Sequence, residues 1–472
     1  MASLVVTTLT GDTVPVAAAT LAEFTAALRG PVLCPTDTGY EAARALWNAH
    51  ITTRPALIVR CIGVADVLAS VTFARTHQLL VAVRGGGHNW PGTSLCAGGM
   101  VIDLSLMTSV RVDPRTQTAR AEGGAKWGHF DRETHAFGLA TTGGTDADTG
   151  LGGLTLGGGL GWLGGAYGLA CDNLLAADVV TADGQVRTAS ATENPELWWG
   201  LRGGCGNFGV VTSLAYQLHP VGTLVAGIAV YPFAHATAVL RFYRELAVTT
   251  PDALNTACAL QTLPDGTRVV GIGVCYNGPP AEAERVLQPF QGLGTPLLTT
   301  IQPRSYYQVQ HLLDGVTPAG HQYYGKSHFM ARLDDAAIDT LLAHFAQVSS
   351  PLSVVVFQQL GNAANRVPAA ATAFGHRDAR YNLNLIGQWT ERAEAARHIQ
   401  WVRTLWEALV PYSTGGVYVT NVGSAAEEGT AVMRAAYGAN YERLVALKQQ
   451  YDPHNLFRHN QNINPAVGAV RT

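Results

Sequence analysis

The chain of 472 residues exceeds the usual size of one domain, so its length predicts two or three domains with ample buried core. Its formal net charge is −3, and no run of lysines and arginines is dense enough to follow a phosphate backbone, which disfavours nucleic acid as a partner. Apolar runs such as "GIGVCYNG" and "LSVVVF" are far shorter than the roughly 20 residues needed to span a bilayer, so no membrane partner is expected.

The cysteines and the N-terminus indicate a cytoplasmic protein. The seven cysteines are odd in number and show no C-x-x-C spacing, which argues against a disulfide framework and against a zinc site. The histidines show no pair with a carboxylate at metal-ligand spacing, so no metal is expected. The N-terminal residues lack the basic and apolar regions of a signal peptide.

Residues 36–84 predict a βαβ unit. The short runs "ALIVR" and "LVAVR" are rich in β-formers and lie on either side of a segment with apolar residues at helical spacing. A further helical pattern, "DTGYEAARALWNAH", precedes them. The second strand ends at Arg84, and the loop after it therefore lies at the carboxyl end of a strand, where α/β folds usually bind ligands.

That loop reads "RGGGHNWPG" and suggests a site for an anionic ligand. Three consecutive glycines allow close approach to the backbone and can present their amides to phosphate. His88, which follows them, is either a buried structural histidine or a nucleophile toward an electrophilic cofactor.

Further strands follow, with a helix from about Lys126 to Phe137, and then a segment with unusual glycine content. Residues 143–168 contain 12 glycines, but leucine, tryptophan and tyrosine throughout argue for an ordered loop near a ligand and against a linker. The pattern G-x-G-x-x-G occurs at Gly159, Gly161 and Gly164, but no strand precedes it and no helix follows, which disfavours a Rossmann unit.

Composition changes near residue 220. Before it, "VVTADGQVRTAS" predicts a hairpin, and "NPELWWGLRGGCGNFGVVTSLAYQL" predicts a helix, a glycine turn and a strand. From about Val221 to Val422 glycines are fewer, and strands alternate with amphipathic helices such as "ERAEAARHIQWVRTLWEAL". The tail predicts a helix that ends at Asp-Pro, followed by an asparagine-rich coil packed on a ligand.

Two further side chains are candidates for chemistry, since the absence of G-x-S-x-G disfavours a serine hydrolase. Lys326 is either a surface lysine or a partly buried amine among aromatic neighbours, where burial would lower its pKa. Tyr418, in the predicted short strand "GGVYV", either packs in the core or faces a substrate.

Five motifs in this order resemble the berberine bridge enzyme-like branch of the vanillyl-alcohol oxidase flavoproteins, in particular its bacterial members: "RGGGHNWPGTS", "VIDLSLM", "GGLTLGGGLGWLGGAYGLACDNL", "TENPELWWGLRGGCGNFGVVT" and "YDPHNLFRHNQNINP". The resemblance implies an α+β fold with two domains. Residues 1–220 and 423–472 would form an FAD-binding domain of the PCMH type, and residues 221–422 a substrate-binding domain with an antiparallel sheet.

The resemblance also implies which residues contact FAD. His88 is similar to the histidine bonded covalently to the 8α-methyl group of the flavin, and the preceding residues would surround the pyrophosphate. By motif position, the cofactor-binding residues would be Arg84, Gly85, Gly86, Gly87, His88, Asn89, Gly92, Thr145, Gly150, Gly152, Leu154, Gly158, Gly159, Gly161, Gly168, Leu169, Asn173, Gly209, Val211, Asn460 and Asn462.

Four residues depart from the family pattern. Asp146 stands where many members have a cysteine that makes a second bond to the flavin, so a single covalent link through His88 is expected. Leu154 replaces a histidine of many plant members. Thr420 and Asn421 follow the "GGVYV" segment where bacterial relatives commonly have Asn-Phe. The substrate-facing residues can therefore be aligned with the family in two ways that differ by one position.

The activity implied is an FAD-dependent oxidase that takes a hydride from a carbon bearing nitrogen or oxygen and reduces O2 to hydrogen peroxide. Tyr418 is the first candidate for base or substrate orienter and Lys326 the second. A small aromatic or otherwise apolar substrate is expected. The alternatives are a carbohydrate oxidase, a dehydrogenase with another acceptor, and a flavin-binding tailoring protein without oxidase turnover; oligomeric state stays open.

Overall fold

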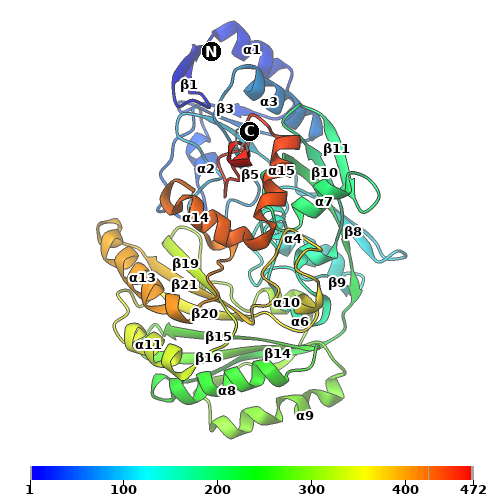
Figure 1. Ribbon diagram of the computed structural model, residues 1–472. Helices are drawn as coiled ribbons and strands as arrows, with labels where there is room; N and C mark the ends of the chain where they lie inside the picture. Colours follow the sequence, from blue (N-terminus) through cyan, green and yellow to red (C-terminus); the bar gives the residue numbers. More distant parts are fainter. Residues whose placement is uncertain (1–2, 424, 469–472) are drawn as a thin grey trace.

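The computed structural model describes residues 3–423 and 425–468. The N-terminal sheets and the C-terminal helices lie together at one end of the molecule, and a large sheet built from the middle of the chain lies at the other (Figure 1). The chain therefore leaves the first part, builds the large sheet and returns. The division at residues 220 and 422 agrees with this arrangement and stays a prediction.

The first sheet contains the strands around the glycine loop. Its order is β3-β4-β6-β5, with β4 and β5 both parallel to β6. The predicted βαβ unit thus forms, with α3 as its helix, but β6, whose side chains are all buried, lies between the two predicted strands. The bounds are β3 Val32–Leu33, β4 Leu57–Arg60, α3 Val64–Thr76, β5 Val81–Arg84 and β6 Met100–Asp103.

The second sheet has five strands in the order β11-β10-β12-β8-β7 and is antiparallel. Its β10–β11 pair is the predicted hairpin, which turns at Gly184 with φ of 78°. The bounds are β7 Val110–Asp113, β8 Thr118–Glu122, β10 Leu174–Val180, β11 Val186–Ser190 and β12 Val210–Gln217. Helices α4 Trp127–His135, α5 Leu151–Leu156, α6 Gly164–Tyr167 and α7 Pro195–Leu201 accompany it.

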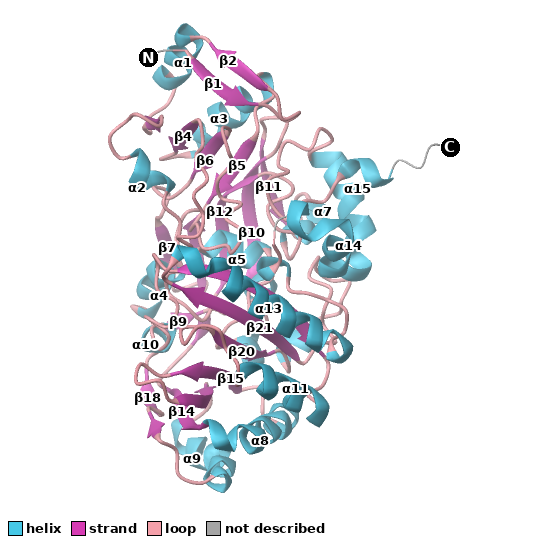
Figure 2. Ribbon diagram, turned by 90° about the vertical axis from the view of Figure 1, so that its left-hand side faces the viewer, coloured by secondary structure: helices cyan, strands magenta, loops and turns pink. Residues whose placement is uncertain are grey.

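The large sheet is antiparallel, with the order β17-β14-β16-β15-β20-β21-β19 and β18 paired to β14. Helices α8, α11 and α13 cover one face, where they pack on alternate residues of the strands, Leu383 and Leu385 among them (Figure 2). Because side chains alternate along a strand, Asn384 and Ile386 face the opposite side, toward the first part of the chain. The bounds are β14 Leu224–Pro232, α8 Ala236–Thr249, β15 Leu254–Thr262, β16 Arg268–Tyr276, β17 Leu298–Thr299, β18 Gln302–Arg304, β19 Gln322–Met330, α11 Asp335–Phe345, β20 Val354–Gln359, β21 Tyr381–Trp389 and α13 Ala395–Leu409.

The tail forms α14 Ala425–Tyr437 and α15 Tyr441–Tyr451, which pack on the five-stranded sheet region. Two predicted elements are wrong. The "GGVYV" strand is absent, because the chain turns at Val419–Asn421 in a short 3-10 helix. The helix expected from residue 37 to 50 is confined to α2, Tyr40–Arg44. The remaining elements are β1 Leu4–Thr7, β2 Thr13–Val16, α1 Ala18–Ala26, β9 Leu139–Ala140, β13 His219–Pro220, α9 Ala283–Leu287, α10 Tyr306–Gln310 and α12 Ala363–Arg366.

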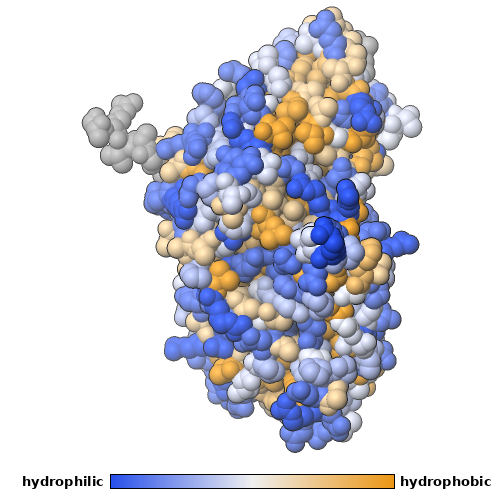
Figure 3. All heavy atoms as spheres, turned by 90° about the vertical axis from the view of Figure 1, so that its right-hand side faces the viewer, coloured by the Kyte–Doolittle hydropathy of each residue, from blue (hydrophilic) through white to orange (hydrophobic). Residues whose placement is uncertain are grey.

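The surface is mainly hydrophilic on the face shown in Figure 3, where hydrophobic residues form separate patches. Among the described residues, no helix combines the length and the apolar character that crossing a membrane requires.

Candidate active site

A cavity of about 350 Å³ lies where the N-terminal sheets, the large sheet and the tail meet. Its lining comes from many parts of the chain, among them the ends of β5 and β6, the glycine loop, the segment around α5, the segment before β12, and the tail. Strands β20 and β21 of the large sheet, with the turn at Tyr418–Asn421, form the roof of the cavity. A ligand in this cavity would contact residues that lie far apart in the sequence.

The glycine loop and the start of α5 meet without side chains between them. A Cβ atom at Gly86 would lie 2.4 Å from the Cα atom of Gly150, and one at Gly123 would lie 2.2 Å from the carbonyl oxygen of Val211. Only glycine permits such contacts, so the backbone itself forms this wall of the cavity.

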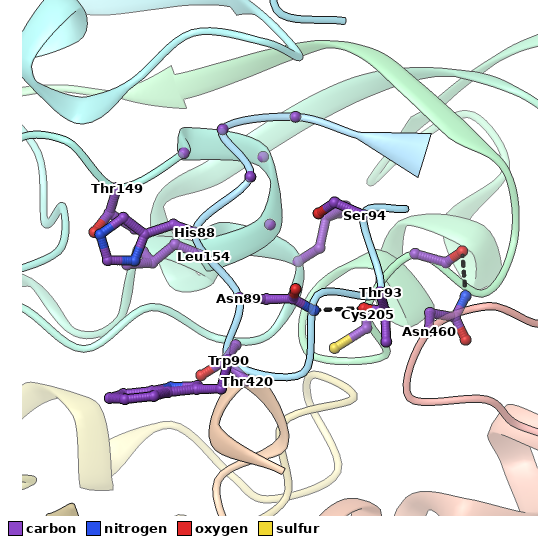
Figure 4. A pocket seen from close by; sticks show the side chains of 18 of the residues that line it. His88, Asn89, Trp90, Thr93, Ser94, Thr149, Leu154, Cys205, Thr420 and Asn460 are labelled. Atoms are coloured by element: carbon purple, nitrogen blue, oxygen red, sulfur yellow. Dashed lines mark hydrogen bonds between the residues drawn. The ribbon is translucent and has the colours of Figure 1, made fainter. Parts of the chain in front are cut away.

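His88 projects into the cavity beside Thr149 and Leu154 (Figure 4). Its ring stacks on Trp47 with centroids 4.2 Å apart, and its Nε2 atom lies 3.7 Å from Oδ2 of Asp146. Burial lowers the pKa of His88, while the nearby Asp146 carboxylate opposes that shift. The imidazole is therefore neutral near pH 7 and held on one face by the indole ring.

Several polar atoms around the cavity are buried and have no partner within the described chain. They include Nε2 of His88, Oδ1 of Asn89 and Oδ1 of Asn460. The other ends of the two asparagines are fixed, since Asn89 Nδ2 donates to Thr93 Oγ1 and Asn460 Nδ2 donates to the carbonyl of Gly206 at 3.1 Å (Figure 4). Buried polar groups are nearly always paired, so these atoms indicate a polar ligand.

Tyr418 lines the cavity as part of the roof, and its hydroxyl accepts a hydrogen bond of 2.9 Å from the amide of Gly159. Burial raises the pKa of Tyr418 to about 12. The phenol is therefore protonated at neutral pH and is suited to donating a hydrogen bond.

Lys326 lies on the other face of the large sheet. It pairs with Leu385 across β19 and β21, and Leu385 faces the covering helices. Its Nζ atom forms an ion pair with Glu428 at 2.7 Å and lies 4.7 Å from the ring centre of Trp406. This placement keeps Lys326 away from the cavity and argues against a role as base.

Of the predicted cofactor-binding residues, about half line the cavity: Gly85, Gly86, Gly87, His88, Asn89, Thr145, Gly150, Gly152, Leu154, Gly209, Val211 and Asn460. The other nine are not among the described lining residues: Arg84, Gly92, Gly158, Gly159, Gly161, Gly168, Leu169, Asn173 and Asn462. Arg84 donates to the carbonyls of Ala43 and Ala45, and Asn173 donates to that of Leu169.

No sequence pattern pointed to the roof residues or to Trp47. Gln358, Asn384 and Ile386 line the cavity because of their strand register, which one sequence does not reveal. Trp47 lies in a segment whose apolar spacing predicted a helix, but this part of the segment forms a loop. His459 is next to the predicted Asn460 and also lines the cavity.

Comparisons with known proteins agree on one family. Residues 55–190 match the family model for an FAD binding domain, and residues 425–464 match the model described as berberine and berberine like. The chain is 35% identical to (R)-6-hydroxynicotine oxidase of Paenarthrobacter nicotinovorans over 93% of its own length and 97% of that protein's. The crystal structure of 6-hydroxy-D-nicotine oxidase from Arthrobacter nicotinovorans superposes with a TM-score of 0.82 at 30% identity, over 93% and 98% of the two chains. A chitooligosaccharide oxidase superposes with a TM-score of 0.83 at 25% identity, over 94% and 98%.

Proposed function

Because the chain belongs to the berberine bridge enzyme-like family of FAD-linked oxidoreductases, we propose that it is an oxidase of a small molecule and that FAD is joined to it through His88. The family assignment confirms the expected fold type and shows that the protein is an enzyme. The covalent bond, the substrate and O2 as electron acceptor belong to the proposal.

The residues of the cavity fit FAD. The side-chain-free contact of Gly86 with Gly150 leaves backbone amides open to phosphate, and Asn89 and Asn460 offer buried oxygens without partners. Valines and leucines, such as Val83 and Leu104, line the end of the cavity near the first sheet and would surround an aromatic base. When bound, FAD supplies the acceptor for a hydride from the substrate carbon and passes the electrons to O2, giving hydrogen peroxide.

The observation that carries the attachment proposal is the state of His88. Its ring is neutral, fixed by Trp47 and directed into the cavity, and its Nε2 atom has no partner in the described chain. A neutral imidazole nitrogen is a competent nucleophile. The Asp146 carboxylate, 3.7 Å from Nε2, would favour the tautomer with the proton on that nitrogen, which leaves the lone pair on Nδ1.

A single covalent link is supported by the chemistry around Asp146. A carboxylate stands where a second attachment would need a thiol. Of the seven cysteines, Cys205 is the one that lines the cavity, and burial raises its pKa to about 12, so its thiol is protonated and unreactive.

Tyr418 is proposed to orient the substrate as a hydrogen-bond donor. The protonated phenol cannot serve as a base at neutral pH without a large change in its surroundings.

The proposed compartment is the cytoplasm, because all seven cysteines are free thiols.

The test combines a denaturing gel viewed under ultraviolet light, intact mass and peroxide release. A fluorescent band with a mass increment of one FAD supports the covalent link. Peroxide release with an alcohol, an amine or a sugar supports an oxidase. Absence of peroxide with all three classes, while the flavin is reduced by one of them, would instead indicate a dehydrogenase with another acceptor. A flavin that no compound reduces would contradict enzymatic oxidation.

A further inference from the structure

A cluster of side-chain amides forms part of the roof of the cavity. Gln358 on β20 and Asn384 on β21 line the cavity, as does Asn421 in the turn after Tyr418. Asn382 pairs with Gln358 across the two strands and completes the cluster from a fully buried position. The four amides come from three segments and meet on the face of the sheet opposite the helices.

The oxygens of the three amides that line the cavity are already used within the protein. Oε1 of Gln358 accepts from Nδ2 of Asn382 and from Nδ2 of Asn384, each at 2.9 Å. Oδ1 of Asn384 accepts from Asn382 at 3.1 Å and from Asn421. Because an amide oxygen has two lone pairs, neither oxygen has further capacity to accept.

The oxygen of Asn421 is used in the same way. It accepts from Nε1 of Trp90 and from Oγ1 of Thr420, both at 3.3 Å. On these three side chains only N–H groups remain: both on Nε2 of Gln358 and one each on Asn384 and Asn421, which donate to no other group within the described chain. Oδ1 of Asn382 is buried without a partner, but Asn382 does not line the cavity. The roof therefore presents hydrogen-bond donors to the cavity.

The lining around the cluster is uncharged, and its polar side chains include Tyr418 and Thr420. Trp90, Ile386 and Leu160 line the cavity with it. Asp146 is the one carboxylate in the described lining, and it is engaged beside His88. An ammonium group at the roof would lose its hydration without gaining a counter-ion, which costs several-fold in affinity.

We infer that the substrate is a neutral molecule with an aromatic or otherwise apolar body, and that the roof amides of Gln358, Asn384 and Asn421 bind a hydrogen-bond-accepting oxygen on it, such as a carbonyl or an alcohol. This inference rests on the proposed function and narrows it: it places protonated amines and polyols, whose hydroxyl groups also need acceptors, outside the preferred class.

The test measures binding and not turnover. Acetophenone, ethylbenzene and 1-phenylethylammonium share one ring and differ at the position that the amides would recognise; D-glucose represents polyols. Dissociation constants are measured with the FAD-loaded protein at pH 7 from changes in flavin absorbance and tryptophan fluorescence. We expect acetophenone to bind about tenfold more tightly than each of the other three, which corresponds to one or two hydrogen bonds.

Gln358→Glu tests the assignment directly. The carboxylate keeps the shape and the bonds from Asn382 and Asn384 but replaces the donating Nε2, so acetophenone should bind about tenfold more weakly and 1-phenylethylammonium should become the preferred probe. Gln358→Met removes the donor without adding charge and should weaken acetophenone binding alone. Gln400→Glu on the exposed face of α13 makes the same chemical change away from the cavity and should alter neither constant.

Three outcomes would overturn the inference: 1-phenylethylammonium or glucose binding as tightly as acetophenone in the unmodified protein, no acetophenone binding up to its solubility, or unchanged preferences in both Gln358 variants. A purified protein without flavin would contradict the proposed function instead, and tryptophan fluorescence would still report the preference among the probes.

Discussion

Nε2 of His88 lies 3.7 Å from Oδ2 of Asp146, while the flat face of its ring rests on Trp47. The carboxylate replaces the thiol expected from the family pattern, and it lies beside the histidine proposed to bind the flavin. At position 146 a negative charge therefore opposes the effect of burial on the pKa of His88.

His88→Ala removes the proposed attachment point. The other cavity residues still fit FAD, so the variant should bind the flavin without a covalent bond and release it on acid precipitation. Intact mass should lack the increment of one FAD that the unmodified protein shows. The exposed His454→Ala serves as control and should keep the increment. Flavin that stays with the precipitate of His88→Ala would place the attachment elsewhere.

Asp146→Asn should slow covalent attachment about fivefold to tenfold at pH 7, because the negative charge 3.7 Å from Nε2 no longer favours one orientation of the His88 ring. The carboxylate also opposes the burial that lowers the pKa of His88. Its removal lowers this pKa further, so the acid side of the rate profile should move to lower pH. Mass spectrometry of apoprotein mixed with FAD follows the rate.

The matched control is Asp148→Asn, since Asp148 carries the same charge but pairs with Lys126. Equal slowing in both variants would show that net charge and not orientation matters, and would contradict the positioning role of Asp146.

Tyr418→Phe removes a hydroxyl whose pKa burial raises to about 12. If the phenol orients the substrate as a donor, kcat should fall about tenfold and the shape of the kcat profile between about pH 6 and 9 should stay the same. A profile that rises with pH in the unmodified enzyme and becomes flat in Tyr418→Phe would identify the tyrosine as a base.

Glu428→Gln should lower the free energy of unfolding by about 3 kcal/mol, because it leaves the Lys326 ammonium, 11% exposed, without its partner. Lys326→Met removes the charge itself and should destabilise less. Urea unfolding gives both free energies.

Because Lys326 faces the helices, kcat of FAD-loaded Lys326→Met should stay within about twofold of the kcat of the unmodified enzyme. A loss of a hundredfold or more would return Lys326 to the list of candidate bases.

The backbone contacts in the wall of the cavity could be predicted from the sequence. The side chains that line the rest of the cavity could not. Gly86 and Gly150 could be predicted because close backbone contact demands glycine. The roof could not, since one residue of register exchanges the two faces of a strand. Lys326 illustrates this: aromatic neighbours suggested a buried amine, but only its pairing with Leu385 shows that it faces the helices.

Asp131 provides a prediction about stability and pH. Its carboxyl is fully buried, Gln310 donates to it at 2.9 Å, and burial raises its pKa to about 8. The unfolded chain loses this proton near pH 4, so its contribution to stability is complete below about pH 4 and declines by about 1.4 kcal/mol per pH unit toward pH 8. Asp131→Asn keeps an oxygen that accepts from Gln310 and never ionises. The variant should therefore gain stability over the unmodified protein as pH rises from 5 to 8, measured by urea unfolding at each pH. A difference between the two proteins that does not change over this range would mean that Asp131 is ionised in the folded state.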